Sequence, residues 1–295
     1  MATVKKITKT EIPCNLCGST KSDILYPDEL GDKPAKVDYN FSPDTRKTYQ
    51  IVRCQSCGLI FTNPMPNLNS VYEDTVDEIY LASSEQRRRT AEKSLKQILK
   101  YKSSGKLLDV GCATGIFLDV ASHHFDVEGI ELSRWAFNEA VKRHTVYNQP
   151  LESLGFSECY DVITLWGVIE HFQHPVREIH SVVSALKPTG LLVLYTGDVD
   201  ALLPRLLGKK WWWYQGMHLY YFSKRTCSQL LNQCGLKILS FDLHPLSFQL
   251  YSLGISLNRY KIGKLFSPIF NLPFIRNIMI SIKISGEMVL FAQKS

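Results

Sequence analysis

The sequence predicts an α/β fold with a doubly wound, mostly parallel sheet, preceded by a small cysteine-rich module. From Lys106 onward, short apolar runs alternate with helical stretches, which is typical of a parallel sheet covered by helices on both faces. The first apolar run ends in a glycine-containing turn that leads into a helix, as open α/β sheets do beside their ligand sites. Residues 1–66 instead carry two Cys-x-x-Cys-Gly units with little periodicity between them.

The composition is that of a globular protein. The chain has 295 residues, 45% hydrophobic and 21% charged, with a formal net charge of +6, enough for one large domain and a small appendage. The basic clusters are short, and we expect Arg87 to Arg89 on the solvated face of a helix. A nucleic-acid-binding chain would carry a broader basic stripe and a recognisable module, so we expect no nucleic-acid partner.

The apolar segments do not predict export or a membrane span. The N-terminal lysines are followed by no apolar segment of the secretory kind. The stretch 265–284 is interrupted by prolines and charges, whereas a span needs about 20 apolar residues. We therefore expect a cytoplasmic protein, with peripheral membrane contact through its basic and apolar stretches at 202–214 and 265–284. In a reducing compartment its eight cysteines are expected to be thiols or metal ligands.

The chain divides by pattern into three parts. Residues 1–66 form the cysteine module, 67–104 a helical linker, and 105–295 the α/β domain, which contains a long, irregular aromatic and apolar insertion at about 198–285. The strand candidates of the domain are the runs 106–111, 126–132, 145–147, 160–166, 190–196 and 287–294. Helices are expected at 133–144 and 175–186.

The turn in LLDVGCATGIFL, residues 107–118, is the first candidate ligand site. Gly111 and Gly115 let the backbone approach a ligand at the carboxyl end of the first strand. The segment lacks the G-x-G-x-x-G spacing of a dinucleotide pyrophosphate site, which argues against a nicotinamide or flavin. A glycine in a strand-to-helix turn is also common without any ligand.

An acid follows at the distance where such folds bind a ribose. Glu131 closes the next strand candidate about 20 residues after the glycine turn, and a carboxylate can accept hydrogen bonds from both ribose hydroxyls. The alternative is an acid at the start of the helix after Ser133. A third segment, YDVITLWGVIEHFQHP at 160–175, runs from a strand into a Trp-Gly turn and then Glu170-His171.

Together these three segments resemble the motifs of class I S-adenosylmethionine-dependent methyltransferases, closely over residues 105–197. The resemblance implies a Rossmann-like, seven-stranded sheet and S-adenosylmethionine as cofactor. It implies that Asp109, Gly111, Cys112 and Gly115 surround the methionine portion, that Glu131 binds the ribose, and that Leu132 contacts the adenine. Trp166 and Gly167 would line the cofactor or the acceptor. Ala113 stands where the family commonly has glycine; we expect alanine to be accommodated without a left-handed backbone.

The paired cysteines predict a structural zinc site. Cys14, Cys17, Cys54 and Cys57 supply the four thiolates of a closed tetrahedral site; a redox pair or buried core cysteines are the alternatives. The module resembles the N-terminal zinc-binding domain of sugar C-methyltransferases, including the segment VRCQSCGLIFTNPMP. Four further cysteines are expected to be ordinary buried thiols: Cys112, Cys159, Cys227 and Cys234.

The aromatic segment, residues 208–222, contains three consecutive tryptophans. All three cannot point into one core, so we expect at least one to be exposed in a cleft or at an interface, where it could stack on a sugar or adenine ring. The alternative is plain aromatic packing.

The candidate general base is His171, with an ordinary imidazole pKa of about 6.5, near the carboxyl end of the sheet. Glu170 could orient it, and His218 is the alternative base. Against this, Glu170 and His171 could merely cap the following helix.

The leading functional hypothesis is methyl transfer to a small-molecule or glycan acceptor, including a lipid-linked sugar. The alternatives are a quinone or other small-molecule O-methyltransferase, another nucleotide-handling enzyme such as a nicotinamide-dependent one, and a zinc-stapled binding protein that has lost activity.

Overall fold

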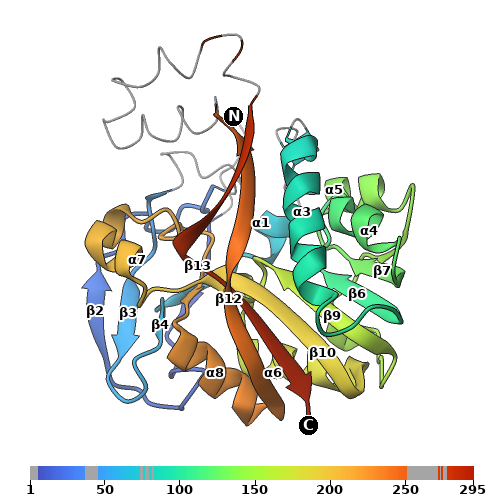
Figure 1. The fold of residues 1–295 in the computed structure, drawn as a ribbon. Helices are drawn as coiled ribbons and strands as arrows, with labels where there is room; N and C mark the ends of the chain where they lie inside the picture. Colours follow the sequence, from blue (N-terminus) through green and yellow to red (C-terminus); the bar gives the residue numbers. More distant parts are fainter. Residues whose placement is uncertain are drawn as a thin grey trace.

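A computed structural model describes residues 6–36, 46–73, 80–81, 83–250 and 278–295, together with residues 76, 272 and 274. Its centre is a seven-stranded sheet with the order β12-β13-β10-β9-β6-β7-β8 (Figure 1). The strands are β6 (Lys106–Val110), β7 (Asp126–Ile130), β8 (Thr145–Tyr147), β9 (Tyr160–Trp166), β10 (Leu186–Gly197), β12 (Leu236–Gln249) and β13 (Met279–Lys294). The five strands from β8 to β10 are parallel, and β13 runs antiparallel to both of its neighbours. The predicted α/β fold with a mostly parallel sheet is confirmed.

The strand order reverses beside β6. From β6 the chain moves to β7 and β8 on one side, then returns to β9 and β10 on the other. Open α/β sheets bind their ligands at such a switch point, outside the carboxyl ends of the strands. The glycine turn after β6 and the acid after β7 lie at this edge.

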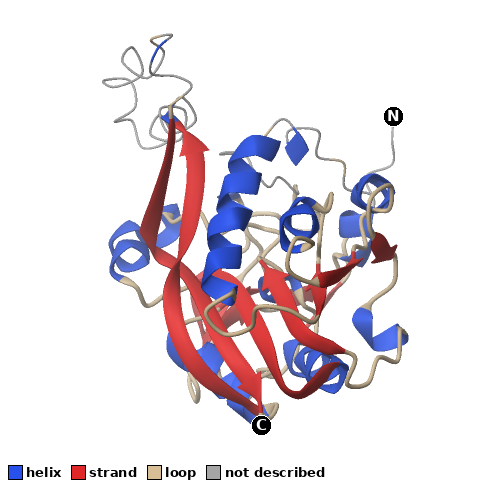
Figure 2. Cartoon of the chain, turned by 45° about the vertical axis from the view of Figure 1, so that its right-hand side comes forward, coloured by secondary structure: helices blue, strands red, loops and turns tan. Residues whose placement is uncertain are grey.

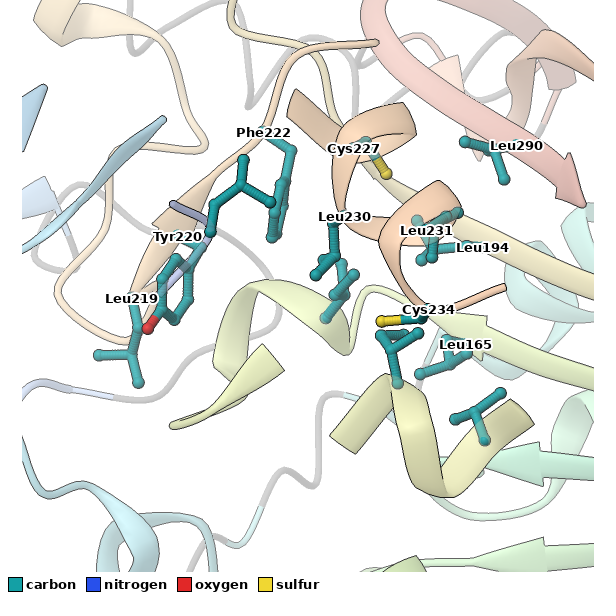
Figure 3. Packing of buried hydrophobic residues seen from close by; sticks show 14 of the residues in the cluster. Leu165, Leu194, Leu219, Tyr220, Phe222, Cys227, Leu230, Leu231, Cys234 and Leu290 are labelled. Carbon is teal, nitrogen blue, oxygen red and sulfur yellow. The ribbon is translucent and has the colours of Figure 1, made fainter. Parts of the chain in front are cut away.

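Helices cover both faces of the sheet because successive strand residues point in opposite directions. Ile163 of β9 packs in the core on the face of α6 (Pro175–Ala185) and α8 (Lys224–Gln233), whereas Val162 packs on the face of α3 (Ser84–Ile98) and α4 (Ile116–Ala121). Figure 3 shows Leu230 and Leu231 of α8 beside the sheet residues Leu165 and Leu194. The sheet is thus doubly wound, as predicted.

The remaining helices are short. In the described residues they are α1 (Asn69–Glu73), α5 (Arg134–Ala140), α7 (Leu202–Leu207) and the single 3-10 turns Leu151–Ser153, Ile169–His171 and Gly208–Lys210. In the part of the chain that the structure describes, no helix combines the length and apolar character needed to cross a bilayer.

The N-terminal cysteine module shares a sheet with the insertion. Strands β2 (Ser22–Tyr26), β3 (Ile51–Cys54) and β4 (Ile60–Thr62) are joined by β11 (Tyr220–Tyr221) in the order β11-β4-β3-β2. Phe61 of β4 lies opposite Tyr220 and stacks on its ring. A second, two-stranded sheet pairs β1 (Lys9–Thr10) with β5 (Met65–Pro66).

The insertion is more regular than the sequence suggests. Within 198–285 the structure has α7, β11, α8 and the 14-residue strand β12, so the prediction of an irregular region is wrong for its first part. β12 and β13 pair from Leu236 to Gln249 and continue beyond the sheet as a two-stranded ribbon (Figure 2). Most of the stretch 265–284 lies outside the described residues.

The packing between module and insertion predicts a measurable loss of stability. Phe61 is buried in the core that includes Tyr220 and the cysteines, so Phe61→Ala should lower the free energy of unfolding by about 3 to 5 kcal/mol. Ile24→Ala, at an exposed position of β2, is the control and should change it by less than about 0.5 kcal/mol. Urea unfolding of both variants measures this, and equal stability of the two would contradict the packing described.

Candidate functional site

The turn after β6 is held in a shape that needs small residues. Gly111 has a left-handed backbone (φ 75°), and a Cβ there would lie 2.6 Å from Cγ2 of Val168. Gly115, also left-handed, is the N-cap residue of α4. Ala113 has φ 47°, so the expectation that alanine avoids a left-handed backbone here is wrong, and the turn carries some strain. The backbone N–H groups of Gly111 and Cys112 both donate to the carbonyl of Ile130, which ties the turn to the end of β7.

Asp109 lies directly before this turn and is buried. Its Oδ1 accepts a hydrogen bond from Oγ1 of Thr164 on β9 (2.6 Å). Burial raises the pKa of Asp109 to about 8, and the charge of Glu131 adds to the rise. A carboxyl held in this way ionises readily only when a cation lies against it.

Glu131 follows β7 and connects two backbone segments. Its Oε2 accepts from Ala113 N–H (2.8 Å) and its Oε1 from Ser133 N–H (2.7 Å). Burial raises its pKa, while these backbone donors act in the opposite direction. Each oxygen keeps a further lone pair, so the carboxylate can still accept from a diol. The two interpretations of Glu131, ribose ligand and helix-start acid, are therefore compatible in this geometry.

The other predicted cofactor residues surround the same edge. Cys112 is buried, and Leu132, beside Glu131, has 40% of its surface exposed. Trp166 ends β9 and packs edge-on against Phe117 of α4. Gly167 has a left-handed backbone, and a Cβ there would lie 3.4 Å from Oε1 of Glu170.

Tyr80 and Arg87 also lie near Asp109 and Glu131, although the sequence pattern predicted no role there for either residue. The Arg87 guanidinium stacks 3.7 Å over the Tyr80 ring and donates from Nε to Oγ of Ser83. Tyr80 lies close enough to Asp109 and Glu131 for their charges to raise its pKa, after the larger effect of burial.

Arg87 is half-buried, so the expectation of a solvated face is wrong for this residue, whereas Arg88 and Arg89 are exposed as expected. A helix that faces solvent and a helix that covers a binding site have the same polar sequence pattern. The sequence around Arg87 therefore gave no sign that this side chain lies at the site.

Glu170, His171 and His218 come together; we call them the Glu-His-His cluster. One ligand-type atom from each lies within 4.8 Å of the others. Nδ1 of His171 is 2.9 Å from the Tyr72 hydroxyl and 3.0 Å from the Met217 carbonyl. Tyr72 and Met217 thus orient this imidazole, whereas Glu170 accepts from Thr196 (3.0 Å).

The titration of the cluster departs from ordinary values. Burial lowers the pKa of His171 to about 4, which corrects the expectation of an ordinary imidazole. Burial also lowers the pKa of His218 well below its usual value, and raises that of Glu170 to about 8.

Glu287 of β13 gathers the aromatic segment, and the sequence analysis missed it too. Its carboxylate accepts from the Tyr195 hydroxyl, from Nε1 of Trp212 (2.6 Å) and from Nε1 of Trp213 (3.0 Å). Trp211 and Trp213 are buried, Trp212 is half-buried, and all three pack in one aromatic cluster. The expectation that three consecutive tryptophans cannot share one core is therefore wrong, and the alternative of plain aromatic packing holds. The signal that could have revealed Glu287 is an acid directly before the apolar run at 288–292.

His244 of β12 lies beside Tyr195 and Trp166, and we call these three rings the aromatic wall. It stacks on Tyr195 with 3.9 Å between ring centroids and lies 5.8 Å from the ring of Trp166. Nδ1 of His244 and Nε1 of Trp166 are buried without a hydrogen-bond partner. Buried polar atoms are rarely left in this state, so they are suited to bind a polar ligand at the end of β9.

The four cysteines of the N-terminal module form a compact group. The Sγ atoms of Cys14 and Cys57 are 3.5 Å apart, and so are the Sγ atoms of Cys17 and Cys54. All four sulfurs lie within 4.8 Å of one another. These distances are far longer than a disulfide bond of about 2.05 Å and close to the roughly 3.8 Å between thiolates around tetrahedral zinc. Gly18 and Gly58 are left-handed and return their N–H groups to the carbonyls of Cys14 and Cys54.

The remaining cysteines are thiols in different surroundings. Cys112, Cys227 and Cys234 are buried as expected, whereas Cys159 is partly exposed, so the expectation is wrong for Cys159.

The described residues fit both S-adenosylmethionine and the zinc ion that the sequence implies. A buried carboxyl, a carboxylate with spare lone pairs and a turn with left-handed glycines suit the ammonium, ribose and methionine parts of S-adenosylmethionine. The four sulfurs suit a structural zinc ion.

Comparisons with known proteins agree with this fold. The tRNA U34 carboxymethyltransferase of Desulfotalea psychrophila (strain LSv54 / DSM 12343) is 31% identical over 115 residues, which cover 35% of this chain and 36% of that enzyme. The mitochondrial ubiquinone biosynthesis O-methyltransferase of Schizosaccharomyces pombe (strain 972 / ATCC 24843) is 34% identical over 117 residues, covering 36% of this chain and 42% of that enzyme. The chain thus matches less than half the length of either enzyme.

A solved structure and a family profile extend the match. The crystal structure of a SAM-dependent methyltransferase from Archaeoglobus fulgidus superposes with a TM-score of 0.51 and 17% identity, over 74% of this chain and all of that one; at this identity the likeness concerns the fold. The profile described as a methyltransferase domain matches residues 83–240. Since that match spans more than half of the sequence, the chain belongs to the methyltransferase-domain family.

Proposed function

We propose that this protein transfers a methyl group from S-adenosylmethionine to a small-molecule or glycan acceptor. The observation that carries the proposal is the pair of carboxyl groups at the ends of neighbouring parallel strands. Asp109 and Glu131 flank a turn in which Gly111 has no room for a side chain. When bound, the cofactor would supply an activated methyl group with its own leaving group. The protein's part is to bind and orient both reactants and to exclude water.

The acceptor would lie against the aromatic wall of Trp166, Tyr195 and His244. Flat rings suit stacking on a sugar, and the two unpartnered nitrogens of Trp166 and His244 could bind its hydroxyls. Either imidazole of the Glu-His-His cluster carries a nitrogen that can accept a proton. These features support nucleotide-linked or lipid-linked sugars as the first acceptors to test.

Two leucines of α7 support the lipid-linked option. Leu202 and Leu206 are 70% and 74% exposed, and Lys210 follows in the next turn. An apolar and basic surface of this kind suits a membrane interface. A quinone is the alternative acceptor, suggested by the name of the ubiquinone-pathway relative.

An acceptor panel tests the proposal. Labelled methyl transfer is followed with nucleotide-linked sugars, with lipid-linked sugars in vesicles and with quinones. We expect labelled product from a sugar, and transfer to quinones alone would contradict the sugar assignment. The absence of transfer to any acceptor, together with no affinity for S-adenosylhomocysteine, would favour a protein that has lost the activity.

The pH dependence of cofactor binding follows from Asp109. Its raised pKa of about 8 means that the free protein holds a proton there at neutral pH. The ammonium group that S-adenosylmethionine and S-adenosylhomocysteine share needs the ionised carboxylate beside it, so binding releases this proton and affinity should rise with pH, by up to about tenfold per unit between roughly pH 6 and 8. Calorimetry with S-adenosylhomocysteine measures the slope. Asp109→Asn should bind more weakly and with a flatter profile, whereas identical pH profiles in both proteins would refute the assignment.

We also propose one structural zinc ion per chain on Cys14, Cys17, Cys54 and Cys57. Protein purified without added zinc should contain it, and the double variant Cys54→Ser, Cys57→Ser should lose it along with stability in residues 1–66. Cys234→Ser, at a buried thiol of α8's C-terminal end, is the control and should keep its metal. Elemental analysis measures the zinc content of the wild type and the two variants. A zinc content in the double variant equal to that of the wild type would contradict the proposed cysteine site.

A further inference from the structure

The Glu-His-His cluster has the composition of a divalent-metal site. One carboxylate and two imidazoles place a ligand-type atom within 4.8 Å of each other, and this set binds first-row divalent cations in many proteins. The cluster is separate from the four cysteines, since its members come from the turn after β9 and from the aromatic segment.

The hydrogen bonds of His171 determine which of its nitrogens is free. The Met217 carbonyl, 3.0 Å from Nδ1, can only accept a hydrogen bond, so Nδ1 carries the proton. The Tyr72 hydroxyl donates its own proton to the same carbonyl, and its oxygen can therefore accept from Nδ1 as well. In the neutral ring the lone pair is then on Nε2, the atom available to a metal.

His218 is arranged in the same way. Its Nδ1 lies 2.7 Å from the Trp213 carbonyl, which again must accept. The two rings are neighbours, with 4.9 Å between their centroids. A backbone carbonyl that fixes Nδ1 and leaves Nε2 unprotonated is the usual support of a metal-binding histidine.

Glu170 supplies a buried carboxylate that lacks a positive partner. It is 1% exposed and accepts from the Thr196 hydroxyl. Among the ion pairs that the described residues form, none includes Glu170, and the charge that acts on it is that of another acid, Glu287. A buried carboxylate without a counter-ion is costly, and a bound cation would remove that cost.

We propose that Glu170, His171 and His218 bind one first-row divalent cation, such as zinc, through the two Nε2 atoms and a carboxylate oxygen. Its use in methyl transfer rests on the proposed function. Three protein ligands leave a coordination position open for an acceptor hydroxyl, and a hydroxyl bound to the cation loses its proton to water more readily than a free one. The imidazoles would then act as ligands, in place of a general base.

Calorimetry with Zn²⁺ and Co²⁺ tests the site. Protein that keeps its cysteine-bound zinc is dialysed against a weak chelator and then titrated with either cation. We expect one additional cation per chain, with affinity at least about tenfold weaker in His218→Ala and in Glu170→Gln. His180→Ala, at an exposed position of α6, should bind as wild type. Bound Co²⁺ should absorb without a thiolate charge-transfer band, since its ligands are nitrogen and oxygen.

Three results would overturn the proposal: no additional cation, a thiolate band from the bound Co²⁺, or wild-type affinity in both ligand variants. If a ligand variant does not fold, Thr196→Val decides instead. It keeps all three ligands but removes the donor to Glu170, and should weaken cation binding about tenfold; unchanged affinity would contradict the site. The affinity of the metal-free protein for S-adenosylhomocysteine separates the two claims, because it should persist even where no cation binds.

Discussion

The arrangement of the site depends on the carboxylate of Glu131. Through one oxygen it binds the turn after β6 at Ala113, and through the other the start of α5 at Ser133. Asn148, just after β8, donates to the carbonyls of Glu131 and Leu132. The ends of three adjacent parallel strands are therefore connected at one residue, and Ala113 is held in a backbone conformation that alanine rarely adopts alone.

A second buried acid connects the insertion to the sheet. Glu287 of β13 binds Tyr195 of the neighbouring strand and two tryptophans of the aromatic segment. The same segment continues into β11, which pairs with β4 of the cysteine module. The module, the insertion and the methyltransferase fold thus share one core. The aromatic wall of Trp166, Tyr195 and His244 is positioned by ring contacts between the methyltransferase fold and the insertion.

Local patterns predicted the central sheet well. The strands at 145–147 and 160–166 have the predicted bounds, because short runs rich in β-branched and aromatic residues between turns are typical of strands. The strand β12 was missed because it lies at the edge of the sheet, has mixed burial and contains Pro245. β11 has only two residues and is defined by a partner far away in the sequence, which no local pattern can reveal.

The sequence also indicated which residues meet at the carboxyl edge of the sheet. Glycines and acids follow consecutive strands, and strand ends in a parallel sheet meet at one edge; that these residues bind the cofactor stays a prediction. The roles of Tyr80, Tyr195, His244 and Glu287 depend on tertiary packing between distant segments, and so did the shifted pKa of His171. Burial decides these properties, and a single sequence does not give the burial of an individual polar side chain.

The most direct test of the account is a comparison of two ligands by equilibrium calorimetry. Wild-type protein should bind S-adenosylhomocysteine and show no affinity for NAD, because the turn after β6 lacks the dinucleotide spacing. Glu131→Gln should weaken S-adenosylhomocysteine binding roughly tenfold or more, whereas Glu139→Gln, which removes only a surface ion pair with Lys142, should not. Preference for NAD, or unchanged affinity in Glu131→Gln, would contradict the account.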